Sequence, residues 1–232
     1  MNKSKQDIQI KIERFHFSIR LKSIFFPLEL AELIPILEEV GYSVRSELSQ
    51  RMPDVPFGVK VVAGGSIAEK RTLGQSFRLD PDRGVVAIVG KDVDSIIDDF
   101  SNLEELIKGK LNVGLRELAL FYEFQVEGSA NTGNDPTKVV ARLFQDSRLQ
   151  SEISRILGFA TTNFGVRIVE QDRYVTDAEW FDFRIEPLVP KPSTSYRFEV
   201  VFRHPERANV VQQAKSLDKT IKKLLSAIEQ EV

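Results

Sequence analysis

Two short motifs occur twice in this chain, about half a chain length apart. FGVKVV begins at Phe57 and returns as FGVRIV at Phe164, and FRLDP begins at Phe77 and returns as FRIEP at Phe183. The two offsets, 164 − 57 = 107 and 183 − 77 = 106, differ by one residue in a chain of 232. This agreement favours duplication of one unit over two chance matches, so we expect the chain to consist of two similar halves.

Hydrophobic periodicity predicts the same order of elements in residues 1–114 and in residues 115–232, which we take as the two α+β repeats. Each half reads as a strand, a helix, three or four strands and a second helix. In the second half the first helix is expected to run from Asp135 to Leu157, and the last helix begins at Pro205. The predicted fold class is α+β, an internal duplication of a β-α-β(3-4)-α unit.

Such a unit covers one face of its antiparallel sheet with its own helices and leaves the other face open. Two units joined edge to edge would pair two exposed edges and give a pseudo-twofold, saddle-like or half-barrel sheet. The alternative is that the two open faces meet. That arrangement would bury charged residues such as Arg14 and Glu123, which is costly unless they pair closely.

Composition limits the classes of function. The chain has 32 Lys and Arg against 34 Asp and Glu, a net charge of −2, and each half carries 16 basic and 17 acidic residues. It has no cysteine, which fits a reducing compartment, and neither an apolar leader nor a membrane-spanning run is visible. We therefore expect a cytoplasmic protein without a membrane association, a metal site or a cofactor.

The repeated motifs supply the main candidate binding residues. The alternation that turns Phe77 and Phe183 inward must turn their neighbours outward, and it predicts four basic residues in two equivalent pairs on one sheet face. These residues are Lys60, Arg78, Arg167 and Arg184. They would bind an anionic ligand, a phosphate backbone or an acidic peptide, or they would form cross-strand ion pairs on a solvated face.

The first strand and the only tryptophan supply the remaining candidates. Arg14, His16 and Arg20 alternate with apolar residues and are expected on the polar side of their strand, next to the same face. Trp180 is expected to be either an exposed contact residue beside Arg184 or a cover for a sheet edge. Neither histidine has a partner at metal-ligand spacing, and glycine-rich nucleotide motifs and nucleophile elbows are missing from the sequence.

Three classes of function follow. The first is a non-enzymatic binding or scaffold protein that holds a protein partner, or another copy of itself as a homodimer, on the open face or an edge strand. The second is a nucleic-acid-binding saddle, because the order of elements resembles the TATA-binding protein, which grips DNA with a concave sheet face. The third is an enzyme or a binder of a small anionic ligand, with a site at the seam between the halves. No catalytic residues are predicted.

Overall fold

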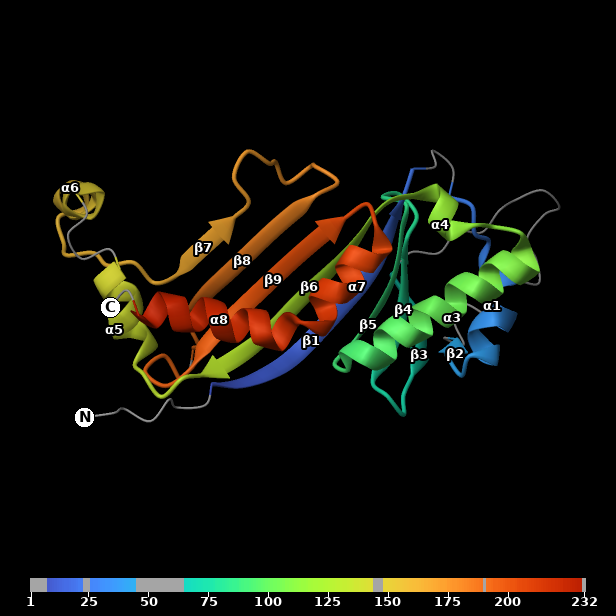
Figure 1. The fold of residues 1–232 in the computed structure, drawn as a ribbon, viewed down its shortest axis with the longest axis horizontal. Helices are drawn as coiled ribbons and strands as arrows, with labels where there is room; N and C mark the ends of the chain where they lie inside the picture. Colours follow the sequence, from blue (N-terminus) through green and yellow to red (C-terminus); the bar gives the residue numbers. More distant parts are fainter. Residues whose placement is uncertain (1–7, 23–25, 45–64, 144–147, 190, 231–232) are drawn as a thin grey trace.

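The computed structural model describes residues 8–22, 26–44, 65–143, 148–189 and 191–230. Within these ranges the chain is an α+β protein with nine strands in one open antiparallel sheet and seven helices (Figure 1). The strands are β1 (Gln9–Leu21), β2 (Ser43–Val44), β3 (Gly65–Lys70), β4 (Gln75–Asp80), β5 (Val85–Gly90), β6 (Ala119–Asn131), β7 (Val166–Val169), β8 (Trp180–Pro187) and β9 (Tyr196–His204). The helices are α1 (Leu30–Glu39), α3 (Val93–Leu111), α4 (Leu115–Leu118), α5 (Pro136–Leu143), α6 (Arg148–Leu157), α7 (Arg207–Lys215) and α8 (Leu217–Gln230).

The two longest strands, β1 and β6, lie side by side in the middle of the sheet. The strand order is β2-β3-β4-β5-β1-β6-β9-β8-β7, so every strand of the first half lies on one side of the β1–β6 pair and every strand of the second half on the other. Pairing between β1 and β6 extends from Gln9 opposite Asn131 to Leu21 opposite Ala119. The predicted α+β class, with one antiparallel sheet, is confirmed.

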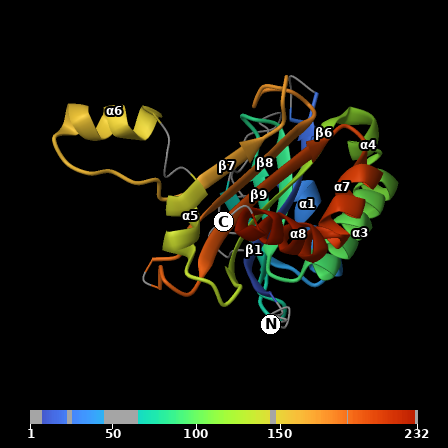
Figure 2. The same cartoon turned by 60° about the vertical axis from the view of Figure 1, so that its left-hand side comes forward.

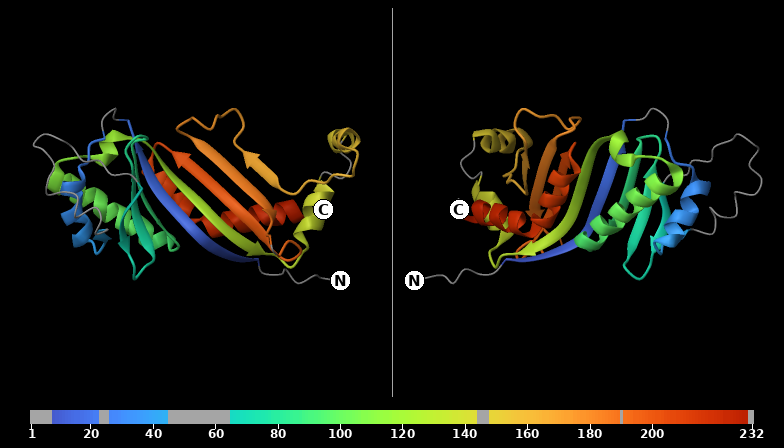
Figure 3. Two further views of the ribbon diagram at one scale, coloured as in Figure 1. Left: turned by 180° about the vertical axis from the view of Figure 1, so that it is seen from behind. Right: turned by 45° about the vertical axis from the view of Figure 1, so that its right-hand side comes forward.

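Helices cover one face of this sheet and leave the other face open near its middle (Figure 3). Alternation along β1 explains the choice of face, since Phe15, Phe17 and Ile19 are fully buried among the helices. Phe15 stacks on Phe124 at 5.8 Å between ring centroids, and Phe124 stacks on Phe202 at 5.7 Å. Each buried aromatic side chain contributes about 2 kcal/mol, and this row of rings runs across the seam between the halves.

A buried ionic cluster ties the helices of the two halves together. The carboxylate of Glu104 on α3 accepts a hydrogen bond from Tyr122 at 3.1 Å and lies 3.2 Å from Nε of Arg207 on α7. Arg116 on α4 donates to the same carboxylate at 3.3 Å. Because an unpaired buried carboxylate is costly, these partners hold α7 against α3.

In the structure, each of two helices predicted from the sequence consists of two shorter helices. The last helix, expected to begin at Pro205, consists of α7 and α8, which Ser216 separates, and both helices bury apolar side chains. The helix expected from Asp135 to Leu157 consists of α5 and α6, and residues 144–147 lie outside the described residues. α6 projects away from the body of the protein and buries no side chain (Figure 2). No helix in the described ranges has the length and apolar character that a membrane span requires.

The repeated motifs occupy three strands that the structure describes. FRLDP lies in β4 and the turn after it, FRIEP lies in β8, and FGVRIV includes β7. The remaining copy, FGVKVV at residues 57–62, lies outside the described residues, and so does the candidate Lys60. On the side of β4 away from β5, the neighbouring strand is β3, which begins at Gly65 and therefore follows that copy in the sequence.

Candidate functional site

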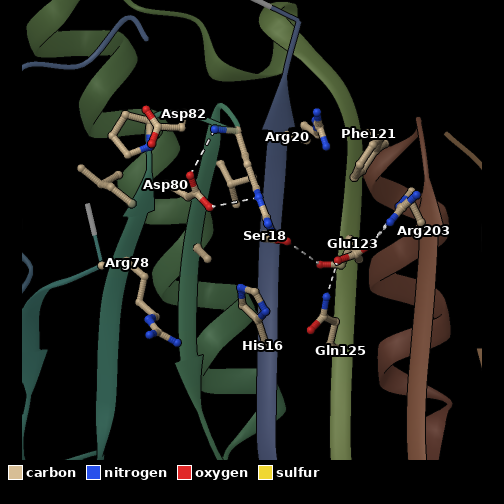
Figure 4. A pocket seen from close by; sticks show the side chains of 16 residues that line it. His16, Ser18, Arg20, Arg78, Asp80, Asp82, Phe121, Glu123, Gln125 and Arg203 are labelled. Carbon is tan, nitrogen blue, oxygen red and sulfur yellow. Dashed lines mark hydrogen bonds and ion pairs between the residues drawn. The ribbon is translucent and has the colours of Figure 1, made fainter. Parts of the chain in front are cut away.

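A pocket of about 500 Å³ lies on the open face, at the seam between the two halves. Its walls come from β4, β5 and β1 of the first half and from β6 and β9 of the second (Figure 4). Side chains from both halves therefore meet over one area of the sheet. The residues on which the site depends are His16, Ser18, Arg20, Arg78, Ala87 and Glu123.

The strand register explains why the sheet is hollow here. Arg78 on β4 lies opposite Ala87 on β5, Ala87 lies opposite Ser18 on β1, and Ser18 lies opposite Glu123 on β6. Adjacent strands are about 4.8 Å apart, so this row runs straight across the sheet. The two middle residues are small and the two outer residues are long. Ala87 and Ser18 therefore form a floor between higher walls.

The neighbouring rows close the hollow along the strand direction. One row places His16 opposite Gln125, and the row on the other side places Arg20 opposite Phe121. The Arg20 guanidinium carbon lies 6.0 Å from the centroid of the Phe121 ring. The floor thus has a guanidinium group at one end and an imidazole at the other, and Figure 4 shows both on β1.

A tight turn between β4 and β5 forms the outer rim. Asp80 accepts a hydrogen bond from the backbone N–H of Arg83 at 3.1 Å, and its carboxylate lies 3.7 Å from Nε of the same residue. Gly84 has φ +65, and an added Cβ would approach the carbonyl oxygen of Leu21 to 3.3 Å. Glycine is thus needed where the turn meets β1, and this contact positions the rim beside the floor.

Arg203 on β9 organises the opposite wall. It donates to the Glu123 carboxylate through Nε at 2.8 Å and through a terminal nitrogen at 2.6 Å. Its other terminal nitrogen donates to the carbonyls of Val175 and Asp177 at 2.8 and 2.9 Å, and its guanidinium lies 4.3 Å from the Phe121 centroid. Arg203 therefore balances the charge of Glu123 and anchors the β7–β8 connection over this end of the open face.

Of the four arginine side chains that line the pocket, two have a carboxylate partner and two have none in the described residues. Arg203 is paired with Glu123, and Arg83 lies beside Asp80. Arg20 and Arg78 have no ion-pair partner among the residues that the structure describes. Their guanidinium groups are available to a ligand, because no carboxylate of the described residues lies within ion-pair distance of them, although Asp80, Asp82 and Glu123 line the same pocket.

His16 is partly buried at the edge of the floor. Burial lowers its pKa below the ordinary value of 6.5, since removal from water disfavours the charged imidazolium. The Glu123 carboxylate and a hydrogen bond with Gln125 act in the opposite direction, whereas the charges of Arg14 and Arg78 add to the lowering. The imidazole is therefore neutral near pH 7 in the absence of a ligand.

The structure brings three of the predicted site residues together and separates the others. Arg20, Arg78 and His16 share the pocket. Arg14, Arg167 and Arg184 lie on the same face outside it and are paired with carboxylates. Their pairs are Arg14 with Glu127 at 3.4 Å, Arg167 with Asp182 at 2.7 Å and Arg184 with Glu199 at 3.4 Å.

The exposed alternative for Trp180 is wrong. Its side chain is on the open face but only 6% exposed. The reason is tertiary, because Trp180 lies opposite Arg203, and the β7–β8 connection crosses the face there to reach that guanidinium group. Trp180 therefore lies beside Arg203, outside the set of residues that line the pocket.

Sequence reasoning did not identify Ser18, Ala87 or Arg203 as site residues. The alternation placed Ser18 on the open face, but a small residue gives no chemical signal unless its cross-strand neighbours are known. Arg203 ends a predicted strand, and its partner Glu123 lies 80 residues away in the chain. Identifying these residues requires the register between neighbouring strands, which the sequence did not reveal.

The pocket contains groups that bind oxyanions. Guanidinium groups donate in a fork that matches carboxylate and phosphate oxygens, and an imidazole adds a further donor. No group of three acidic or histidine side chains suited to a metal ion occurs in the described part of the chain. No protein-family model matches the chain, and the search of curated proteins finds no match either.

Proposed function

We propose that this protein binds a small organic anion in the pocket and that it does so without catalysing a reaction. The observation that carries the proposal is the pair of guanidinium groups, Arg20 and Arg78, beside a hollow and without carboxylate partners in the described residues. A charge-assisted hydrogen bond is worth about 1.5–3 kcal/mol. A cavity of about 500 Å³ also falls in the range typical of small-ligand sites.

The hydrogen bonds inside the pocket support binding over catalysis. The Ser18 hydroxyl donates to the backbone carbonyl of Glu123 at 3.3 Å, so it is not directed at a general base. The Glu123 carboxylate is held by Arg203 and by Gln125, which donates at 2.7 Å. The Glu123 carboxylate is therefore a structural part of the wall, and the Ser18 hydroxyl is a structural part of the floor.

Calorimetric titration with inorganic phosphate at low ionic strength tests the proposal. Changing Arg20→Ala and Arg78→Ala together is expected to weaken phosphate binding at least about tenfold, because both free donors are lost. The matched control changes Arg167→Ala and Arg184→Ala, which removes the same charge from the same face. Equal loss of binding in the two double variants would show a general charge effect and would refute the pocket.

A second candidate is a docking surface for a protein partner or another copy of this chain at the far end of the sheet. The observation in its favour is that α6 exposes an apolar side while β7 forms the edge of the sheet. Exposed apolar patches and open sheet edges are common binding surfaces. The exposed apolar residues there include Leu149 at 70%, Ile156 at 68%, Phe159 at 63% and Phe164 at 50%.

Sedimentation equilibrium tests the version with a second copy. We expect the apparent mass of the original chain to rise with concentration. The variant that combines Leu149→Ser and Ile156→Ser should keep the mass of a monomer. Lys215→Ser, on α7, and Lys219→Ser, on α8, serve as the control pair. A monomer mass at every concentration would refute self-association at this surface.

The nucleic-acid saddle receives less support. A duplex binder needs free cations along its concave face to neutralise phosphates. Arg14, Arg167 and Arg184 are instead each paired with a carboxylate on that face. Duplex DNA binding that falls steeply with salt would reverse this ranking.

We also infer that the two halves arose by duplication and are related by a pseudo-twofold axis. The strand order supports this, because β3-β4-β5-β1 on one side corresponds to β7-β8-β9-β6 on the other. The equivalent motifs at Phe77 in β4 and Phe183 in β8 agree with it. An experimental structure in which these two sets of strands do not superimpose would refute the inference.

A further inference from the structure

Three residues with donor side chains lie around the pocket floor. Arg78 comes from β4, across Ala87 from Ser18. Arg20 and His16 come from β1, one on each side of Ser18, and Figure 4 shows them at opposite ends of the floor. These three residues therefore lie on three sides of a floor that is two strands wide. In Figure 4 the Arg78 side chain points toward the His16 end of the floor, and Arg20 lies beside Phe121.

This arrangement favours a tetrahedral head group over a planar one. A carboxylate presents two oxygens in one plane, which suits one guanidinium fork. A phosphate or sulfate group presents three or four oxygens in different directions, so it can accept from donors on three sides at once. The two guanidinium groups without an ion-pair partner in the described residues supply positive charge for such a group, whereas the Asp82 carboxylate on the rim opposes it.

His16 is the one donor whose charge depends on its surroundings. The charged groups that face it are Arg14 on its own strand, Arg78 on β4 and Glu123 on β6, while its neighbour on β5 is the apolar Val89. Glu123 is already engaged by Arg203 and Gln125. A bound anion would add negative charge beside the ring and favour the imidazolium form.

Resting on the proposed function, we infer that the head group of the ligand is a dianionic tetrahedral oxyanion, of the phosphate or sulfate type, and that His16 is protonated in the complex. Binding then takes up a proton from solution. The affinity for the dianion rises as the pH falls from above the pKa of His16 in the complex to below its pKa in the free protein. Each unit between these two pKa values corresponds to about a tenfold gain in affinity.

Sulfate and methyl sulfate are the probes that separate charge from shape. Both are tetrahedral, and both keep a constant charge over the range in which histidine titrates, with two negative charges on sulfate and one on methyl sulfate. We expect sulfate to bind the full chain at least about tenfold more tightly than methyl sulfate, and methyl sulfate more tightly than acetate, which carries the same charge. Equal binding of sulfate and methyl sulfate would overturn the dianionic head group, and acetate binding as tightly as methyl sulfate would overturn the tetrahedral one.

Imidazole NMR titration tests the proton uptake directly, because the chain has only two histidines. The H204Q variant assigns the remaining signal to His16 and serves as the matched control. Saturating sulfate is expected to raise the pKa of His16 by about one unit. The H16Q variant should still bind sulfate through Arg20 and Arg78, but with an affinity that no longer rises on acidification.

The outcomes separate the two proposals. Sulfate binding with an unmoved His16 pKa would overturn the proton uptake and leave anion binding in place. Sulfate binding that is unaffected by combining Arg20→Ala with Arg78→Ala would overturn the assignment of both to this pocket. If none of the anions binds, the proposed function fails as well. Thermal unfolding of H16Q, monitored by circular dichroism, shows whether an altered affinity reflects the site or a loss of folding.

Discussion

The two ends of the open sheet face carry the same residue type in different surroundings. Arg184, in the second half, lies opposite Glu199 and pairs with it. Arg78, in the first half, lies between Ser66 on β3 and Ala87 on β5. Both belong to the repeated motif, and both point to the same side of the sheet. The availability of a guanidinium group is therefore decided by its cross-strand neighbours.

Arg14 and Arg20, which lie on the same strand, also differ because of their cross-strand neighbours. Arg14 lies opposite Glu127 and pairs with it, whereas Arg20 has Phe121 on one side and Val85 on the other. Neutral neighbours leave a cation without a partner, and small neighbours leave space beside it. The pocket occurs where both conditions hold. The predictions below test this difference between the two regions.

The largest expected effect is on stability, at the wall that separates the two regions. Arg203→Met should lower the free energy of unfolding by about 3 kcal/mol, because Glu123 would stay buried without its main partner. Urea unfolding at neutral pH measures the loss. Arg184→Met, in an exposed pair, should cost less than about 1 kcal/mol. Similar losses of unfolding free energy for both variants would contradict the difference expected between the buried and the exposed pair.

A smaller effect is expected from filling the floor. Ala87→Leu places a large side chain in the hollow and should weaken phosphate binding about tenfold, since the head group loses its space. Titration calorimetry measures the change. Ala87→Ser, which preserves the hollow, should bind as the original chain does. Unchanged binding by the leucine variant would place the ligand elsewhere on this face.

The pH dependence of stability tests the environment of His16. Its pKa is lowered from 6.5 by burial, so the folded protein binds fewer protons at this site than the unfolded chain. The free energy of unfolding therefore rises with pH between the lowered pKa and 6.5, and this contribution is lost on acidification through that window. The loss amounts to about 1.4 kcal/mol for each unit between the folded and unfolded pKa values.

Urea unfolding of H16Q across the same window measures this contribution. The variant should lose less stability on acidification than the original chain. Identical pH profiles for the original chain and H16Q would show that burial does not disfavour the charged form of His16.

The smallest expected effect concerns the paired arginines. A double-mutant cycle on Arg184 and Glu199 should give a coupling energy of about 0.5 kcal/mol, as expected for an exposed cross-strand pair. The same cycle on Arg78 and Ser66, cross-strand neighbours without an opposite charge, should give none. A coupling for Arg78 as large as that for Arg184 would show that Arg78 is not free for a ligand.

Much of the fold follows from local patterns. The alternation in β1 correctly placed Phe15 and Phe17 in the core and His16 on the open face, because side chains alternate in every strand. Asp92 precedes α3 as an N-cap residue of the type that such a pattern favours, and its carboxylate accepts from the Ser95 N–H at 2.7 Å. The division of the last helix at Ser216 was missed, since the apolar stripe continues through it.

The sequence by itself determined which face each strand residue occupies, and so it placed His16, Arg20 and Arg78 on one open face. Only the tertiary structure decided that Arg20 and Arg78 lie next to a floor of Ala87 and Ser18 and that Arg184 lies next to Glu199. The physical reason is that the alternation of side chains is a property of one strand, whereas register is a property of two. Residues 69 positions apart, such as Ser18 and Ala87 (87 − 18 = 69), become neighbours only when the whole sheet assembles.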